Sequence, residues 1–256
     1  MNKPGGDEHK GDENVEREAT ARSRRAFLTM GVGAAAAYGG WAWLRSRSRE
    51  DDVEWPLRRV LGGNERIAEA YFSNRHLSPA FDQSRVDATA RRNGDVGLGE
   101  DFEAARWVLN VQGSEDAIPR QVSMAQIRQL PRVEQITQLN CIEGWTVIVK
   151  WAGARFADFT VKYAEQFRDA RYVGMQTPDQ AYFVGLDSAS ALHPQTLLCY
   201  EMNGADLTST HGAPLRLVIP VKYGVKNIKR IGKIVYTNER PEDYWANEGY
   251  DWYAGL

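Results

Sequence analysis

The sequence predicts an α+β fold, organised as a single body over residues 53–256. Runs of β-branched and aromatic residues recur at the length of short strands. Short segments with the apolar spacing of helices interrupt these runs, and no internal repeat is found. Mixed short strands and short helices are typical of an α+β domain. The chain has 256 residues, 43% of them hydrophobic, so it can bury a core without needing a disulfide.

The predicted strands combine β-branched, aromatic and aliphatic residues over a few positions each. They are residues 106–113, 135–140, 146–151, 172–175, 181–186, 197–202, 215–220 and 228–236. Asn203-Gly204 is predicted to form a turn after one of them.

Short helices are predicted between the strands. They are residues 123–130, 156–167 and 188–192, while residues 61–75 are helical or irregular. Ser123 is the predicted N-cap of the first of these, and Pro131 ends it. Residues 89–101 contain three glycines and several charges, and they are predicted to form a loop.

The N-terminus is predicted to be a targeting segment rather than part of the folded domain. Residues 1–22 are polar and charged, so they cannot bury enough apolar surface to fold and are expected to be disordered. In residues 23–50, Arg24 and Arg25 precede Phe27-Leu28 and an apolar run, as in a twin-arginine export signal. The protein is therefore expected in the periplasm, exported already folded.

The fate of this signal stays open. Residues 26–44 are uncharged and would extend ~28 Å as a helix, close to the ~30 Å of a bilayer core. No small-residue cleavage site follows Leu44. Cleavage of the segment and its retention as an inner-membrane anchor are both compatible with the sequence.

Charge and cysteine content narrow the function. The net charge is −2 without a clustered basic face, so no nucleic-acid partner is expected. Cys199 lies in an apolar strand-like run and is predicted to be a small buried hydrophobe. Cys141 stands at the mouth of a strand with Glu143 two residues on, so it is placed to ligate a soft metal or to act as a nucleophile, and a packed thiol is equally compatible.

Cations follow Cys141 at a distance in the sequence. His211 and Arg216 are succeeded by three lysines at positions 222, 226 and 229. Such cations suit an anionic, phosphate-bearing ligand. Taken singly, a histidine such as His211 is more often a turn residue than a ligand contact, and Arg216 is more often a solvated strand residue.

The order of these motifs resembles a known family. From Trp107 to Trp252 the chain is similar to the molybdopterin-binding domain of the sulfite oxidase family, and most of all to its exported bacterial branch, which includes the periplasmic protein-methionine-sulfoxide reductase catalytic subunit. The stretches that carry the resemblance are residues 140–145, 192–198, 200–204, 211–220, 222–224 and 226–229. The resemblance implies the sulfite-oxidase-type fold, with mixed sheets and short helices.

The resemblance also implies roles for residues. Cys141 would be the one protein ligand of molybdenum in a molybdenum–molybdopterin cofactor. His211 and Arg216 fall where the family binds the pterin and its phosphate. The full set of implied cofactor contacts is Asn74, Arg75, His76, Thr177, His211, Arg216, Asn227, Ile228 and Lys229.

The implied chemistry is oxygen-atom transfer carried by the cofactor. A carboxylate at Glu143 would repel the sulfite dianion, so reduction of a sulfoxide-like substrate is expected, with sulfite dehydrogenation as the alternative. Glu143 is also a candidate proton donor. Pairing of its carboxylate with an arginine such as Arg155 or Arg171 is an equal alternative.

Partners and other function classes follow from what the sequence lacks. There is no heme-attachment Cys-x-x-Cys-His motif, so a membrane heme protein or a soluble cytochrome is expected as the electron partner. Without room for the dimerisation domain of eukaryotic sulfite oxidases, a monomer is expected. A cofactor-free binding module stays open, as does a hydrolase using Cys141 with His76, His193 or His211.

Overall fold

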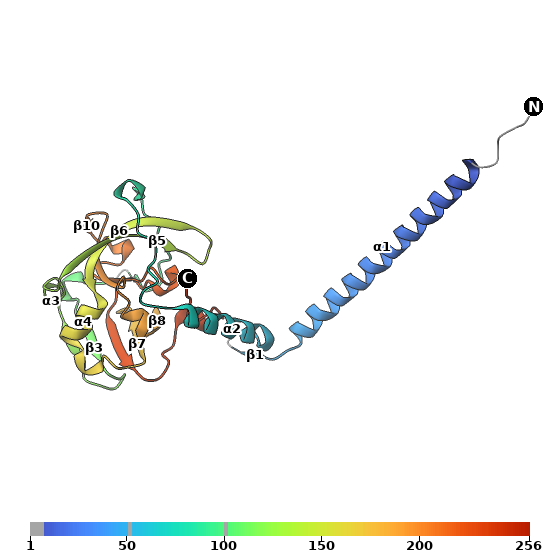
Figure 1. Ribbon diagram of the computed structural model, residues 1–256. Helices are drawn as coiled ribbons and strands as arrows, with labels where there is room; N and C mark the ends of the chain where they lie inside the picture. Colours follow the sequence, from blue (N-terminus) through green and yellow to red (C-terminus); the bar gives the residue numbers. More distant parts are fainter. Residues whose placement is uncertain (1–7, 51–52, 100–101) are drawn as a thin grey trace, which may run out of the picture. The chain divides into compact units, whose positions relative to one another are not determined.

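The computed structural model of the protein describes residues 8–50, 53–99 and 102–256, in two compact units, residues 1–57 and 58–256 (Figure 1). The α-helices are α1 (Glu8–Arg45), α2 (Trp55–Tyr71), α3 (Met124–Ile127), α4 (Phe156–Tyr163), α5 (Ser188–Ala191) and α6 (Tyr244–Asn247). The strands are β1 (Arg49–Glu50), β2 (Val53–Glu54), β3 (Leu109–Gln112), β4 (Arg120–Val122), β5 (Arg132–Asn140), β6 (Thr146–Arg155), β7 (Tyr172–Gln176), β8 (Phe183–Asp187), β9 (Leu197–Met202), β10 (Ala205–Asp206), β11 (Arg216–Val218) and β12 (Lys233–Thr237).

The first unit consists of α1, the short antiparallel pair β1–β2 and the start of α2. Residues 1–22 were predicted to be disordered; in the structure α1 begins at Glu8, and residues 1–7 lie outside the described residues. Glu, Lys, Arg and Ala are frequent in this segment, and their high helix propensity favours a helix. Among the described residues, none of the helices has both the length and the apolar character that crossing a bilayer requires.

Two sheets build the second unit (Figure 1). The first has the strand order β10-β9-β6-β5, with β11 also paired to β9, and its pairs are antiparallel. The second has the order β4-β3-β12-β7-β8, in which β12 runs parallel to β3 and the other pairs are antiparallel. Mixed sheets with short helices confirm the predicted α+β class.

The main core receives side chains from both sheets and from α4, whose Phe156 and Phe159 are fully buried. Leu198 of β9 belongs to this core, whereas Leu197 and Cys199 pack in a second cluster on the other face. Successive strand residues point to opposite faces, so a strand that is buried on both faces has a continuous apolar sequence. Cys199 is a buried hydrophobe, as predicted.

Turn chemistry confirms two further predictions. Ser123 caps α3 and completes a capping box with Gln126. Asn203 and Gly204 have φ angles of 52° and 85°, which suit the tight hairpin between β9 and β10.

One predicted strand, over residues 228–236, is wrong in its first half. β12 begins only at Lys233, because the preceding residues bond to another segment. The Ile228 carbonyl accepts from Leu217 N, and Ile231 N donates to the Leu215 carbonyl. Arg230 has a φ of 51°, which breaks the extended conformation. This irregular segment carries the residues expected to bind the cofactor.

Candidate active site

Cys141 lies in the turn that joins β5 to β6. Its amide donates to the Trp145 carbonyl at 2.9 Å, and its carbonyl accepts from Gly144 N at 3.1 Å. Gly144 has a φ of 84°, a conformation that favours glycine. The Asn-Cys-Ile-Glu-Gly-Trp sequence thus closes a hairpin that presents the thiol at the end of a strand, as predicted.

The thiol opens into a cavity of about 220 Å³. The lining combines the Cys141 turn, the 93–96 segment, the 224–229 segment and the C-terminal region. Its residues are Asn93, Gly94, Val96, Cys141, Ile142, Glu143, Tyr182, Gly224, Val225, Asn227, Lys229, Trp245 and Tyr250. The structure therefore brings four predicted site residues, Cys141, Glu143, Asn227 and Lys229, into one cavity.

Charges around the thiol act in opposite directions. Burial raises the pKa of the Cys141 thiol, and the negative charge of Glu143 raises it further, whereas the positive charge of Arg91 lowers it. A metal ion would displace the thiol proton, since thiolate is the ligating form.

The Glu143 carboxylate accepts a hydrogen bond from Trp145 Nε1 at 2.7 Å. The alternative of an ion pair with Arg155 or Arg171 is wrong among the described residues, because the hairpin turn directs Glu143 toward its own indole neighbour instead. Arg91 stacks over that indole, with its Cζ 4.6 Å from the ring centroid. Trp145 therefore contacts both Arg91 and Glu143, and Glu143 is part of the cavity lining.

Arg216 is a buried cation beneath the cavity. It is 1% exposed, its Cζ lies 4.9 Å from the Trp151 ring centroid, and burial lowers its pKa to about 10. Its Nη1 donates to the His211 carbonyl at 3.1 Å, and its Nη2 donates to the Asn227 carbonyl at 3.3 Å. Arg216 thereby joins two segments that the sequence analysis assigned to the cofactor.

Residues 96–245 match the protein-family model described as "Oxidoreductase molybdopterin binding domain". The chain belongs to this family. It is a molybdopterin-dependent oxidoreductase of the sulfite oxidase family, and the turn, cavity and cations described above all lie in or beside the matched residues.

Two relatives match most of the chain. A protein of Azospira oryzae named as a protein-methionine-sulfoxide reductase subunit, YedZ1, is 33% identical over 237 residues, which are 91% of this chain and 88% of the relative. The protein-methionine-sulfoxide reductase catalytic subunit MsrP of Campylobacter jejuni is 34% identical over 258 residues, covering 93% of this chain and 82% of the relative. The crystal structure of the sulfane dehydrogenase SoxCD from Paracoccus pantotrophus aligns with a TM-score of 0.49 and 14% identity, over 56% of this chain and 41% of that chain.

The cation cluster of this oxidoreductase fits the phosphate of a molybdopterin. Burial lowers the pKa of Lys229 to about 8, the positive charges of Arg216, Arg92 and Arg230 lower it as well, and the negative charge of Asp95 opposes them. Burial also lowers the pKa of His211, to which the charges of Arg216, Lys229 and Arg92 add. Cations that depress one another's pKa are relieved by a bound anion.

Two further predicted contacts support the walls of the cavity. Ile228 is fully buried and pairs through its backbone with Leu217, which fixes the segment between Asn227 and Lys229. Thr177 is buried as well, and its Oγ1 donates to Asp179 Oδ1 at 2.6 Å and accepts from Tyr182 N at 3.1 Å. Since Tyr182 lines the cavity, Thr177 holds one of its walls.

The predicted N-terminal contact segment lies elsewhere. His76 lines a separate cavity of about 250 Å³, and neither Asn74 nor Arg75 is among the residues that line the Cys141 cavity. The His76 ring stacks on Tyr71 with centroids 4.8 Å apart. Asn140, which directly precedes Cys141, lines the same cavity as His76.

Residues 90–97 provide the contacts that the sequence analysis missed. Asn93 Nδ2 donates to the Gly224 carbonyl at 3.2 Å, and Lys229 Nζ donates to the Gly94 carbonyl. His211 Nε2 lies 3.3 Å from the Ala90 carbonyl. The available signal was Arg91-Arg92 directly before an Asn-Gly turn, which was interpreted only as a loop.

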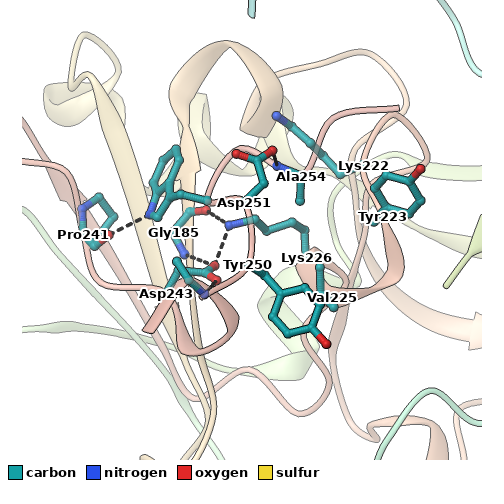
Figure 2. A network of polar contacts seen from close by, with 12 residues as sticks. Gly185, Lys222, Tyr223, Val225, Lys226, Pro241, Asp243, Tyr250, Asp251 and Ala254 are labelled. Carbon is teal, nitrogen blue, oxygen red and sulfur yellow. Dashed lines mark hydrogen bonds and ion pairs between the residues drawn. The ribbon is translucent and has the colours of Figure 1, made fainter. Parts of the chain in front are cut away.

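A buried polar network supports the C-terminal wall (Figure 2). Lys226 Nζ donates to Asp243 Oδ2 at 2.5 Å and to the Gly185 carbonyl at 2.9 Å, and Gly185 N donates to the same carboxylate at 3.1 Å. Asp243 is also the N-cap of α6. Trp245 within α6 and Tyr250 just after it line the cavity, so this network sets the position of both aromatic rings.

Proposed function

We propose that this oxidoreductase reduces methionine sulfoxide, using a molybdenum–molybdopterin cofactor with Cys141 as the protein ligand of the metal. The observation that carries the proposal is that the Cys141 thiol shares one cavity with Asn227 and Lys229, next to a cluster of cations whose charges lower the pKa of Lys229. The names of both relatives refer to protein-methionine-sulfoxide reductase, which supports this substrate class.

Each candidate residue has a defined task in this proposal. Cys141 holds the metal, Arg216 and Lys229 neutralise the phosphate, and His211, Thr177 and the 227–229 backbone position the pterin. When bound, molybdopterin with its metal supplies two-electron oxygen-atom transfer. In the overall reaction the sulfoxide oxygen leaves as water with two protons and two electrons, and the sulfide is released.

The rim of the cavity favours a neutral sulfoxide over sulfite. Glu143 places a carboxylate beside the thiol, which repels a sulfite dianion. Tyr182, Trp245 and Tyr250 form an aromatic wall, on which the thioether sulfur of the methionine product would pack favourably.

Export and an external electron source complete the proposal. The Arg24-Arg25 motif supports export by the twin-arginine route, which suits a chain that acquires its cofactor before crossing the membrane. We propose that a membrane heme protein or a soluble cytochrome in the periplasm supplies the electrons, since the chain has no heme-attachment motif of its own.

The test begins with metal and pterin analysis of the full chain, matured with its own N-terminal segment. About one molybdenum per chain is expected in the wild type and almost none in Cys141→Ser, because a thiolate is replaced by a weaker ligand. Cys199→Ala is the matched control, since Cys199 is buried in a hydrophobic cluster, and this variant should keep its molybdenum. Undiminished molybdenum in Cys141→Ser would refute the ligand assignment.

Substrate assays complete the test. With reduced benzyl viologen as electron donor, the loaded wild type should turn over methionine sulfoxide. In the opposite direction, with an artificial electron acceptor, it should show little oxidation of sulfite. Efficient sulfite oxidation without sulfoxide reduction would reject the proposed substrate.

A further inference from the structure

Arg91 lies beside the Cys141 cavity, and its guanidinium forms no ion pair within the part of the chain that the structure describes. It lies two residues before Asn93, which lines the cavity, and its guanidinium stacks on Trp145. Trp145 in turn donates to Glu143, another lining residue. The side chain is exposed, yet its charge is close enough to act on the Cys141 sulfur.

The neighbouring cations are already engaged. Arg92 forms an ion pair with Asp95 at 3.5 Å, and Lys229 donates to two backbone carbonyls. Within residues 8–50, 53–99 and 102–256, the guanidinium of Arg91 forms neither an ion pair within 4.0 Å nor a hydrogen bond. Its hydrogen-bond donors are therefore available to a ligand at the cavity mouth.

We propose that Arg91 is a substrate-binding residue that contacts a carboxylate flanking the methionine sulfoxide of a peptide substrate. This inference rests on the proposed function, because it concerns the part of the substrate outside the cavity. A guanidinium that stacks by its face on an indole keeps its edge free, and that edge matches a carboxylate in two parallel hydrogen bonds.

The ligand is a flanking carboxylate rather than the sulfoxide itself for two reasons. Arg91 is exposed on the rim, whereas the cavity that would take the sulfoxide is lined by Cys141, Glu143 and aromatic rings. Glu143 disfavours an anion inside the cavity, so a negative group is best placed where Arg91 compensates that charge.

The experiment compares three synthetic peptides that carry one methionine sulfoxide flanked by aspartate, by serine or by lysine. Loaded enzyme and reduced benzyl viologen are used at low salt. In the wild type, kcat/KM for the aspartate peptide should exceed that for the serine peptide by about two- to fivefold, as expected of an exposed ion pair. This preference should shrink at high salt, because exposed charges are screened.

Arg91→Gln should remove the preference, because KM rises more for the aspartate peptide than for the serine peptide, so that the ratio of the two kcat/KM values falls to about one. Arg85→Gln is the matched control, because Arg85 is also exposed and stacks on an aromatic ring, that of Phe81, but is not adjacent to the Cys141 cavity. That variant should keep the wild-type preference. Equal loss on all three peptides in Arg91→Gln, or no preference in an active wild type, would overturn the role of Arg91. Inactivity of the wild type on every peptide would instead reject the proposed function.

Discussion

At the scale of single residues, the site is distinguished by two buried cations, Arg216 and Lys229, that form no ion pair with a carboxylate of the described residues. Arg216 is bonded to backbone carbonyls, and Lys229 is surrounded by other positive charges. Burying such charge is costly unless a ligand compensates it. Binding of the anionic cofactor should therefore increase the free energy of unfolding, because the anion compensates this buried charge.

This arrangement predicts that inorganic phosphate or pyrophosphate stabilises the cofactor-free protein, with a pH limit. Lys229 attracts the anion only while its side chain is protonated, and burial lowers its pKa to about 8. The rise in Tm on adding anion should therefore shrink as the pH increases through about 8. Thermal unfolding with and without anion at pH 7 and pH 9 measures this effect.

Lys229→Met provides the control for that prediction. It should show a smaller anion effect at pH 7 and little further change at pH 9. An anion effect in the wild type that stays constant over this pH range would contradict the assignment of Lys229 to the anion.

At the scale of secondary-structure elements, the Lys226–Asp243 pair determines how the C-terminal region meets β8. Both side chains are buried, Asp243 caps α6, and Trp252 packs over Gly185, where a Cβ would lie 2.7 Å from the indole. The aromatic residues that follow Asp243 can reach the cavity only while this connection holds.

Asp243→Asn should lower the free energy of unfolding by about 3–5 kcal/mol, because it leaves the Lys226 charge buried without its counter-ion. Glu242→Gln, an exposed change at the adjacent residue, should have almost no effect. Urea unfolding of the three proteins tests this. A loss in the free energy of unfolding below about 1 kcal/mol would show that Lys226 does not remain in the variant as a buried, unpaired charge.

Elements were predictable where local chemistry determines them. The capped helix at Ser123, the Asn203-Gly204 turn and the strand ending at Cys141 follow from side-chain preferences within a few residues. The 228–231 segment was not predictable as irregular, because its backbone bonds to residues 212–217, which are distant in sequence. Residues 90–97 were missed for the same reason, since their role depends on Lys229 and Gly224.

At the scale of the whole molecule, Lys222 links stability to pH. Burial lowers its pKa from an ordinary 10.5 to about 7, with its Nζ 3.4 Å from Asp187 and close above the Tyr253 ring. Between pH 7 and about 10 the unfolded chain holds a proton that the folded chain has released. The contribution of this residue to stability therefore rises with pH in that range.

Lys222→Met should accordingly stabilise the protein more at pH 6 than at pH 9, relative to the wild type. At pH 6 the wild type buries a charged ammonium, and at pH 9 it buries a neutral amine. Denaturant unfolding of both proteins at the two pH values gives the difference directly. A difference that does not depend on pH would show that Lys222 stays charged in the folded state.

The walls of the Cys141 cavity come from the 93–96 segment, the hairpin turn, the 224–229 segment and the residues around α6, which are far apart in the sequence. A chain that is truncated, or only partly folded, cannot assemble all of them. The amount of molybdopterin that a preparation holds, compared with its total protein, should therefore measure the fraction of chains in which all four segments have come together.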